Sequence, residues 1–179
     1  MNANPTTVRA IEPLDINELV AFFAYNNVPS VTRQFHPFTL SPESAYMIAL
    51  TPHQDRYYAA FMEEKIVGLV MLRGWDEGYA IPSLGILVDR EHQGVGIGNL
   101  LMRHAIREAR INSVCTIRLS VYGSNHLARK MYENCGFREV SRESLTVSDT
   151  PDVKQIMILD LSPSQTLLRH ILPPPILSQ

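Results

Sequence analysis

Residues 89–99 read Asp-Arg-Glu-His-Gln-Gly-Val-Gly-Ile-Gly-Asn, and this stretch decides the fold that the sequence predicts. Its glycines, Gly94, Gly96 and Gly98, stand at alternate positions directly before an amphipathic segment. Glycine can take a positive φ and lets the backbone approach a ligand closely, while the first N–H groups of a helix are free to bind an anion. The stretch therefore predicts a phosphate-binding loop, with an ordinary glycine-rich turn as the alternative.

The segments on either side of this loop agree with that interpretation. Residues 83–88, Ser-Leu-Gly-Ile-Leu-Val, form a nearly all-apolar run, which is typical of a strand buried on both faces. Residues 98–110 have helical periodicity, because apolar side chains recur at intervals of four from Ile97 to Ala109. Two common phosphate motifs are excluded: Asn99 replaces the third glycine of a dinucleotide fingerprint, and the chain lacks the Gly-Lys-Ser/Thr of a Walker loop.

Two stretches resemble one known family. Gln93-x-x-Gly96-x-Gly98 resembles the Gln/Arg-x-x-Gly-x-Gly/Ala pyrophosphate motif of the GCN5-related N-acetyltransferase (GNAT) family. Residues 125–137, Asn-His-Leu-Ala-Arg-Lys-Met-Tyr-Glu-Asn-Cys-Gly-Phe, are similar to its Asn-x-x-Ala-x-x-x-Tyr-Glu-x-x-Gly-Phe helix and turn. The resemblance covers residues 65–161 and implies acetyl-CoA as cosubstrate. It also implies an α/β fold with a mixed, mostly antiparallel, splayed sheet of about seven strands flanked by helices.

The resemblance also implies site residues. Tyr132 matches the family's general acid, which protonates the departing thiolate; a buried aromatic is the alternative role. A phenol pKa of about 10 and a thiol pKa of about 8.5 allow this without large shifts. Asn125, seven residues earlier on the same helix face, is a CoA ligand or a plain helix cap. In the family, a bulge in the strand matching residues 84–88 frees backbone groups for the pantetheine arm. The residues expected to bind CoA are Leu87, Val88, Gln93, Gly94, Val95, Gly96, Ile97, Gly98, Asn99 and Asn125.

The base that takes a proton from the attacking amine is less well defined by the sequence. Glu77 is the first candidate, because related enzymes often use a carboxylate near the central strand, directly or through water. An acidic residue in a loop is, however, often merely solvated. Asp76, His36 and water remain alternatives, with a packed histidine as the other role of His36. Tyr79 and Trp75 either shape the acceptor pocket or cover the sheet edge.

The remaining elements follow from hydrophobic periodicity and turn residues. They are a strand at 6–11, a helix at 16–25 capped by Asp15, a loop at 30–40, a short helix at 41–51, a hairpin of strands at 56–62 and 65–73, a loop at 74–82, a helix at 125–134, strands at 116–121, 137–144 and 155–161, and a turn at 148–152. Residues 1–161 are expected to form one acetyltransferase domain. For the apolar, proline-rich tail at 162–179, the alternatives are docking on the domain, docking on a second subunit of a homodimer, and disorder.

Composition excludes several classes of function. The net charge of -2 and the pI near 6.3 give no general attraction to polyanions, so nucleic acid is not an expected partner. Cys115 and Cys135 lack metal-site spacing and the density of a disulfide scaffold, and the histidines form no metal motif. Reduced thiols and no metal are therefore expected. The N-terminus lacks a leader pattern and no apolar run is long enough to span a bilayer, which predicts a cytoplasmic protein without a membrane partner.

The predicted activity is direct transfer of the acetyl group to a primary amine in a ternary complex. Cys135 has no accompanying His-Asp pair, which disfavours an acetyl-cysteine intermediate. A small-molecule acceptor such as an amino sugar is favoured, because residues 74–82, Gly-Trp-Asp-Glu-Gly-Tyr-Ala-Ile-Pro, resemble acetyltransferases of surface-polysaccharide biosynthesis. A protein amine is one alternative, and a non-catalytic acyl-CoA sensor on the same fold is another.

Overall fold

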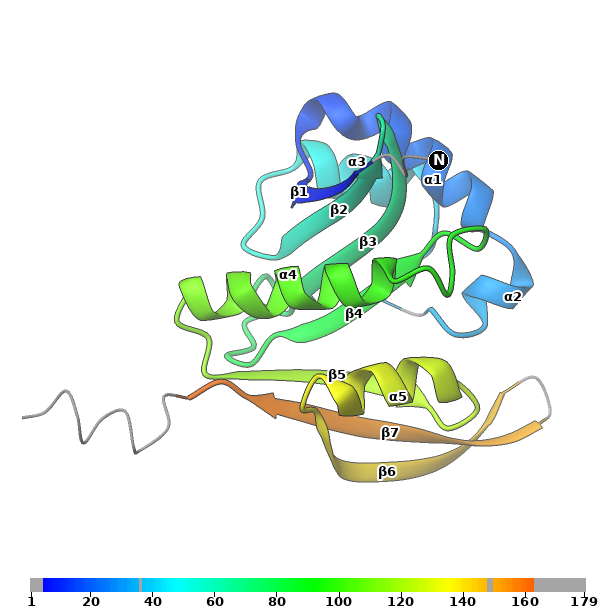
Figure 1. The fold of residues 1–179 in the computed structure, drawn as a ribbon, viewed down its shortest axis with the longest axis vertical. Coiled ribbons are helices and arrows are strands. Elements are labelled where there is room, and N and C mark those ends of the chain that lie inside the picture. Colours follow the sequence, from blue (N-terminus) through cyan, green and yellow to red (C-terminus); the bar gives the residue numbers. More distant parts are fainter. Residues whose placement is uncertain (1–4, 36, 148–149, 163–179) are drawn as a thin grey trace, which may run out of the picture.

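The computed structural model describes residues 5–35, 37–147 and 150–162, in which seven strands form one sheet in the order β1-β2-β3-β4-β5-β7-β6 (Figure 1). All neighbouring strands are antiparallel except β4 and β5, which are parallel. The strands are β1 (Thr6–Ala10), β2 (Arg56–Met62), β3 (Lys65–Arg73), β4 (Ser83–Val88), β5 (Thr116–Tyr122), β6 (Arg138–Val147) and β7 (Thr150–Asp160). The helices are α1 (Ile16–Asn26), α2 (Pro29–Thr32), α3 (Pro42–Leu50), α4 (Ile97–Ile111) and α5 (His126–Asn134), with a 3-10 turn, η1 (Pro13–Asp15). The expected α/β fold class is confirmed.

Helices cover the two faces of the sheet, and each face has its own core. On one face α1 and α3 pack against the β1–β4 half around Phe23 and Leu69, both fully buried. On the other face α4 crosses the same strands, and α5 lies over β5 and β7 (Figure 1). The predicted apolar face of α4 is confirmed, because Leu101 and Ala105 are completely buried against this face. Successive residues of β2, β3 and β4 therefore point to opposite cores.

The parallel strands β4 and β5 are the pair that separates. They share one bridge, Ser83 with Arg118, where Arg118 N donates to Pro82 O at 3.0 Å. On its other edge β4 pairs with β3 along all 6 of its residues without a break in register. The sheet is thus joined at the start of β4 and opens toward its end, which is the splay expected of the fold.

Two local predictions about element boundaries are wrong. Residues 29–32 form α2 where a loop was expected, with Pro29 at the first helical position. β7 begins at Thr150, so residues 150–152 of the expected turn at 148–152 are strand, and residues 148–149 lie outside the described chain. Pro151 fits this strand although it has no N–H group to donate. The C=O of Val153, two residues later, is on the β5 side and accepts from Gly123 N, so the nitrogen of Pro151 is on that side as well. It lies beyond Tyr122, the last paired residue of β5, where no partner needs a donor.

Two further local predictions are corrected. Asp15 does not cap α1 with its side chain: its carboxylate accepts from Arg9 Nη1 and Nη2 at 2.6 and 2.7 Å and from Glu12 N at 2.8 Å, tying β1 to η1. The hydrogen bonds from Arg9 are the largest cause of a lowered pKa of Asp15. The bulge expected in β4 is absent from its ladder with β3, and the register shifts lie in the β2–β3 and β6–β7 ladders instead.

Candidate active site

The glycine loop ends at a helix N-terminus with free backbone donors. Gly96 is the N-cap of α4 with a φ of 96°, and no side chain caps the helix. The first hydrogen bond of α4 runs from Leu100 N to Gly96 O at 3.1 Å, so the N–H groups of residues 97–99 have no acceptor within the helix. The first turn carries no acidic side chain, and the helix dipole adds positive charge there. These groups can bind an anion such as a pyrophosphate.

The beginning of this loop is fastened to α1 by buried polar groups. Asn26 is fully buried; its Nδ2 donates to Asp89 Oδ2 at 3.3 Å, and its Oδ1 accepts from Arg90 N at 3.2 Å. Asp89 Oδ1 also accepts from Glu91 N at 2.9 Å and lies 3.0 Å from His92 Nδ1. Burial alone would raise the pKa of Asp89, but the hydrogen bonds from His92, Glu91 and Asn26 lower it. Sequence reasoning missed this anchor, because it joins residues far apart in the chain.

Successive residues of β4 direct their backbone N–H and C=O groups alternately toward β3 and toward the opening between β4 and β5. Asp89 N donates to Val67 O at 3.0 Å, so odd-numbered residues face β3 and even-numbered residues face the side of β5. Leu87 therefore uses its backbone groups in the ladder with β3. Ile86 and Val88 have no strand partner on the β5 side within the described chain. Leu87 and Val88 were both expected to bind CoA, but only Val88 has backbone groups open to a ligand. The backbone groups of Ile86 are open in the same way, and sequence reasoning missed this residue.

The C-terminal end of α5 fixes the position of Tyr132. Gly136 follows the helix with a φ of 91°, and its N–H donates to Glu133 O at 3.0 Å. Phe137 N donates to Tyr132 O at 3.1 Å, which completes a Schellman motif. The centroids of the Phe137 and Tyr132 rings lie 6.0 Å apart. The Gly-Phe pair of the second motif thus ends the helix and packs against the predicted acid.

Other residues expected to bind CoA lie around the contact between α4 and α5. Asn125 caps α5, since its Oδ1 accepts from Ala128 N at 3.2 Å. Gly98 faces α5 closely, because a Cβ there would lie 3.1 Å from Met131 Sδ. Ile97 is buried in the core beneath the loop. The exposed members of the set are Gln93, Gly94, Val95, Gly96 and Asn99.

A cavity of about 440 Å³ lies where β4 and β5 separate. Tyr132 lines it from α5, and Glu77 lines it from the loop after β3. Gly85 and Ile86 of β4 form part of its wall, and Tyr79 closes another side. The structure therefore brings the predicted acid and the first candidate base to one cavity, next to the open edge of β4.

Burial decides the protonation state of Tyr132. Its side chain is 8% exposed, and burial raises the pKa of Tyr132 to about 12. The phenol is therefore protonated at neutral pH. The raised pKa also makes the phenol a weaker acid than a free thiol, whose ordinary pKa is about 8.5, so the phenol protonates a departing thiolate only while the charge on sulfur develops.

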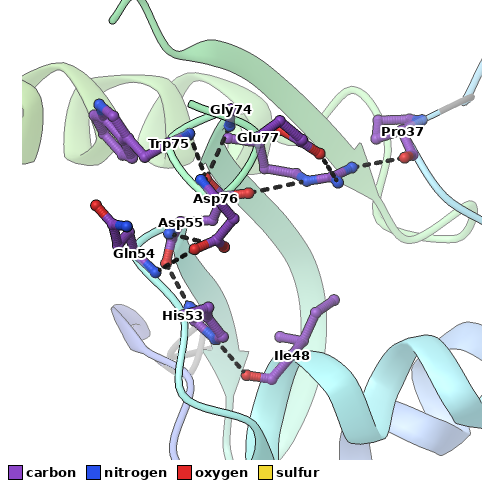
Figure 2. A network of polar contacts seen from close by, with 10 residues as sticks. Pro37, Ile48, His53, Gln54, Asp55, Gly74, Trp75, Asp76 and Glu77 are labelled. Atoms are coloured by element: carbon purple, nitrogen blue, oxygen red, sulfur yellow. Dashed lines mark hydrogen bonds and ion pairs between the residues drawn. The ribbon is translucent and has the colours of Figure 1, made fainter. Parts of the chain in front are cut away.

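Asp76, the neighbouring carboxylate, is held away from the chemistry by its hydrogen bonds (Figure 2). One of its oxygens accepts from Gln54 N at 2.7 Å and the other from Asp55 N at 3.3 Å. The buried Asp55 carboxylate accepts in turn from Gly74 N at 2.8 Å and Trp75 N at 2.9 Å. Two carboxylates thus bind each other's backbone and fix the loop that carries Glu77. Among the residues that line the cavity, Asp76 is absent.

Glu77 keeps one charged neighbour in this loop. Its Oε1 lies 3.3 Å from Arg73 Nη2, and half of its side chain is exposed. Arg73 Nη1 also donates to Pro37 O at 2.6 Å, which ties the loop to the segment after α2 (Figure 2). His36, another candidate base, lies outside the described residues. The geometry therefore leaves Glu77 as the carboxylate at the cavity.

A second hollow, a cysteine, and the lack of metal-ligand clusters and membrane spans in the described chain complete the picture of the site. A larger hollow of about 780 Å³ is lined by Trp75 and Cys115 at the end of the sheet away from the start of α4, and neither Tyr132 nor Glu77 lines it. Cys135 is partly buried, and burial raises the pKa of its thiol. In residues 5–35, 37–147 and 150–162 no three His, Cys, Asp or Glu side chains gather as metal ligands. No helix in that part of the chain has the length and apolarity to cross a membrane.

Comparison with known proteins gives one family and a set of relatives. The family model described as Acetyltransferase (GNAT) family matches residues 17–137. N-acetylaspartate synthetase of Xenopus tropicalis is 32% identical over 84 residues, which are 47% of this chain and 31% of that protein. [Ribosomal protein bS18]-alanine N-acetyltransferase of Escherichia coli (strain K12) is 35% identical over 79 residues, 43% of this chain and 53% of that protein. The chain thus spans about a third to a half of the length of these curated relatives.

Solved structures show the same fold at low sequence identity. A GNAT-family acetyltransferase from Streptococcus pneumoniae superposes with a TM-score of 0.74 at 22% identity, covering 88% of this chain and 100% of that one. Spermidine N-acetyltransferase from Vibrio cholerae, solved in complex with CoA and spermine, superposes with a TM-score of 0.72 at 23% identity, covering 88% of this chain and 96% of that one.

Proposed function

The chain belongs to the acetyltransferase (GNAT) family, and on this basis we propose that it moves the acetyl group of acetyl-CoA to a primary amine. The observation that carries the proposal is the cavity between β4 and β5, which Glu77 and Tyr132 line together. The free N–H groups of residues 97–99 follow the end of β4, where they would hold the pyrophosphate of CoA. The open backbone edge at Ile86 and Val88 lies between these donors and the cavity and would guide the pantetheine arm.

The proposed step is nucleophilic attack of the amine nitrogen on the thioester carbonyl. Glu77, directly or through water, takes one proton from the amine, the new C–N bond forms, and the C–S bond breaks. The Tyr132 hydroxyl gives its proton to the departing sulfur, so CoA leaves as a thiol. The high pKa of Tyr132 keeps the hydroxyl protonated until the thiolate forms, and it also makes the phenol a weaker acid than an ordinary tyrosine. The proton taken from the amine restores the phenol through solvent, and protons balance over the cycle.

Direct transfer in a ternary complex is favoured over an acetyl-enzyme. An acetyl-cysteine route needs a thiolate nucleophile, whereas burial raises the pKa of Cys135 and so favours its unreactive thiol. Cys135 is also absent from the residues that line the cavity. The enzyme is therefore proposed to hold both substrates at once and to gain rate from their orientation.

A small-molecule acceptor is the first choice. A volume of about 440 Å³ is within the range of pockets that enclose small ligands. An amino sugar is an acceptor of suitable size. The second candidate is the N-terminal amine of a protein, which the named activity of the Escherichia coli relative suggests. A small amine must fit wholly inside the cavity, whereas a protein acceptor inserts only its first residues.

An acceptor screen with acetyl-CoA tests the proposed function. Thiol release is followed with a panel of amino sugars, amino acids, polyamines and peptides that begin with alanine, and mass spectrometry identifies the acetylated product. We expect thiol release that depends on a small amine and matches the acetylated product one to one. Turnover on peptides alone would favour the protein acceptor. Tight CoA binding without turnover on any amine would contradict the proposal and indicate an acyl-CoA sensor.

A further inference from the structure

The charged side chains that line the cavity are unbalanced in sign. Arg73, Arg118 and Lys154 are cationic, and among the described residues Glu77 is the one acidic side chain in the lining. Arg73 is already neutralised by contacts with Glu77 at 3.3 Å and with the buried Asp55 at 3.5 Å. Two cations, Arg118 on β5 and Lys154 on β7, therefore face the cavity without such a neighbour.

Neither of these two cations has an ion-pair partner in the described chain. Glu143 lies directly opposite Lys154 in the β6–β7 ladder, but no ion pair joins the two side chains. Arg118 pairs across the β5–β7 ladder with the apolar Ile158. The two charges are thus available to a ligand in the cavity.

Strand alternation puts both cations on the face of the sheet opposite α4 and α5. In β5, Ile117 and Leu119 are buried in the core beneath α4 and α5, so Arg118 points the other way. In β7, Met157 belongs to that same core, and Lys154, an odd number of residues away, lies on the opposite face. The phosphate-binding end of α4 is on the first face. The cations are therefore on the face away from the proposed pyrophosphate site, which leaves them to the acceptor.

Amines of different charge would meet different environments here. A polyamine brings two or more positive charges and needs acidic partners, but within the described part of the chain Glu77, already paired with Arg73, is the one carboxylate that lines the cavity. An amine that carries a carboxylate or a phosphate instead matches the two unpaired cations, which line the cavity from neighbouring strands four register positions apart, with Glu77 in the same lining. Charge-assisted hydrogen bonds of this kind are stronger than neutral ones.

We infer that the acceptor is a small amine bearing an anionic group, and that Arg118 and Lys154 bind this anion. The inference rests on the proposed acetyl transfer and adds to it the charge class of the substrate. The anion is held beside β5 and β7, and the amine is directed toward Glu77 and the thioester at the edge of β4.

Matched pairs of acceptors test the inference. D-glucosamine 6-phosphate is compared with D-glucosamine, and L-aspartate with L-asparagine amide, so that each pair differs in its anionic groups; spermidine represents polycations. We expect kcat/KM to be at least 10-fold higher for the charged member of one pair, and the better pair tells phosphate from carboxylate. Equal or higher kcat/KM for the neutral members, or for spermidine, would overturn the inference while leaving acetyl transfer intact.

Variants assign the effect to the two cations. Arg118→Gln and Lys154→Gln each remove one charge from a side chain that is not fully buried, so the fold is expected to persist. Each should raise KM for the anionic acceptor by about 10-fold, the value of one charge-assisted hydrogen bond, and leave KM for the neutral analogue and for acetyl-CoA unchanged. The matched control is Arg110→Gln on the exposed last turn of α4, which should change none of these values. A raised KM for acetyl-CoA in either variant would show that the cations serve the cosubstrate and would overturn the inference.

A binding measurement separates failure of this inference from failure of the proposed function. Calorimetry with the same acceptor pairs, on protein saturated with CoA, needs no turnover. Binding of the anionic member that weakens in Arg118→Gln would support the inference even if no acceptor is acetylated. Absence of any preference for the anionic member, alongside measured acetyl transfer, would leave the proposed function standing and the inference wrong.

Discussion

At the scale of single residues, adjacent carboxylates differ in function because their partners differ. Asp76 uses both oxygens to bind the backbone before β2, whereas Glu77 has one contact, with Arg73, and lines the cavity. Sequence alone left the two as alternatives, since both stand in the same polar loop. The distinction comes from a partner 21 or 22 residues away, which no local pattern records.

Glu77→Gln should slow the enzyme and change its pH profile. If Glu77 takes the amine proton, the amide cannot replace it, and turnover should fall by about 10²-fold, the lower end of what a positioned base contributes. The acidic limb of the kcat/KM profile should change, because Glu77 no longer takes the amine proton and only the titration of the amine itself remains. Steady-state rates from pH 5 to 9 check this.

The control for this prediction is Glu64→Gln, which removes the same charge from the exposed turn between β2 and β3. It should leave both the rate and the profile unchanged. A Glu77→Gln enzyme that keeps the acidic limb of the wild type would assign the base to water or to His36.

At the scale of elements, each of the two motifs builds one end of a helix. The glycine loop leaves the N-terminus of α4 without a cap, and the Gly-Phe turn closes the C-terminus of α5 with a Schellman motif. Both ends depend on a positive φ, at Gly96 and at Gly136. Motif spacing predicted the existence of these helices, and the caps explain why the glycines stand where they do.

Replacing Gly96 with alanine should weaken acetyl-CoA binding. A Cβ at this φ of 96° strains the N-cap and enters the space where backbone and pyrophosphate meet, although no protein atom lies within 4 Å of it. Affinity measured by calorimetry should fall by about 10-fold or more, the value of one charge-assisted hydrogen bond. The matched control is Gly78→Ala, because Gly78 also has a positive φ and open space around it but lies in another loop. Equal affinities in the two variants would contradict the phosphate role of the loop.

Replacing Gly136 with alanine should lower stability and disturb Tyr132 together. Its φ of 91° disfavours a Cβ by roughly 1–2 kcal/mol, and the added atom would lie 3.3 Å from Leu159 Cδ1. Urea unfolding should show this loss, and kcat of the folded protein should fall because the Schellman motif positions Tyr132. Asparagine tolerates positive φ better, so Gly136→Asn should recover part of both losses. Full activity in Gly136→Ala would mean that the turn does not position the acid.

At the scale of the whole molecule, the function follows from a sheet that is joined at one point and open beyond it. Local patterns predicted most strands and helices, because burial in this fold follows periods of two and 3.6 residues. They missed what depends on pairing between distant segments: the odd and even edges of β4, the anchor from Asn26 to Asp89, and the charges of Arg118 and Lys154. Only the assembled sheet brings these groups to one place.

Tyr132 is where the two sides of this arrangement meet. It belongs to a helix on the proposed cosubstrate face and lines a cavity that also contains Glu77 and the unpaired cations of the other face. The Tyr132 hydroxyl is therefore expected to serve the chemical step and not the binding of either substrate. Because burial raises the pKa of Tyr132 to about 12, this hydroxyl should remain protonated, and the acid role intact, up to about pH 11.

The most direct test is the single-turnover rate of Tyr132→Phe, which keeps the ring and removes the hydroxyl. The rate of acetyl transfer should fall by roughly 10²–10⁴-fold at every pH from 6 to 10, with acetyl-CoA affinity and the free energy of unfolding nearly unchanged. Single-turnover conditions are required because slow product release would mask a slower chemical step. A wild-type single-turnover rate in well-folded Tyr132→Phe would contradict the account.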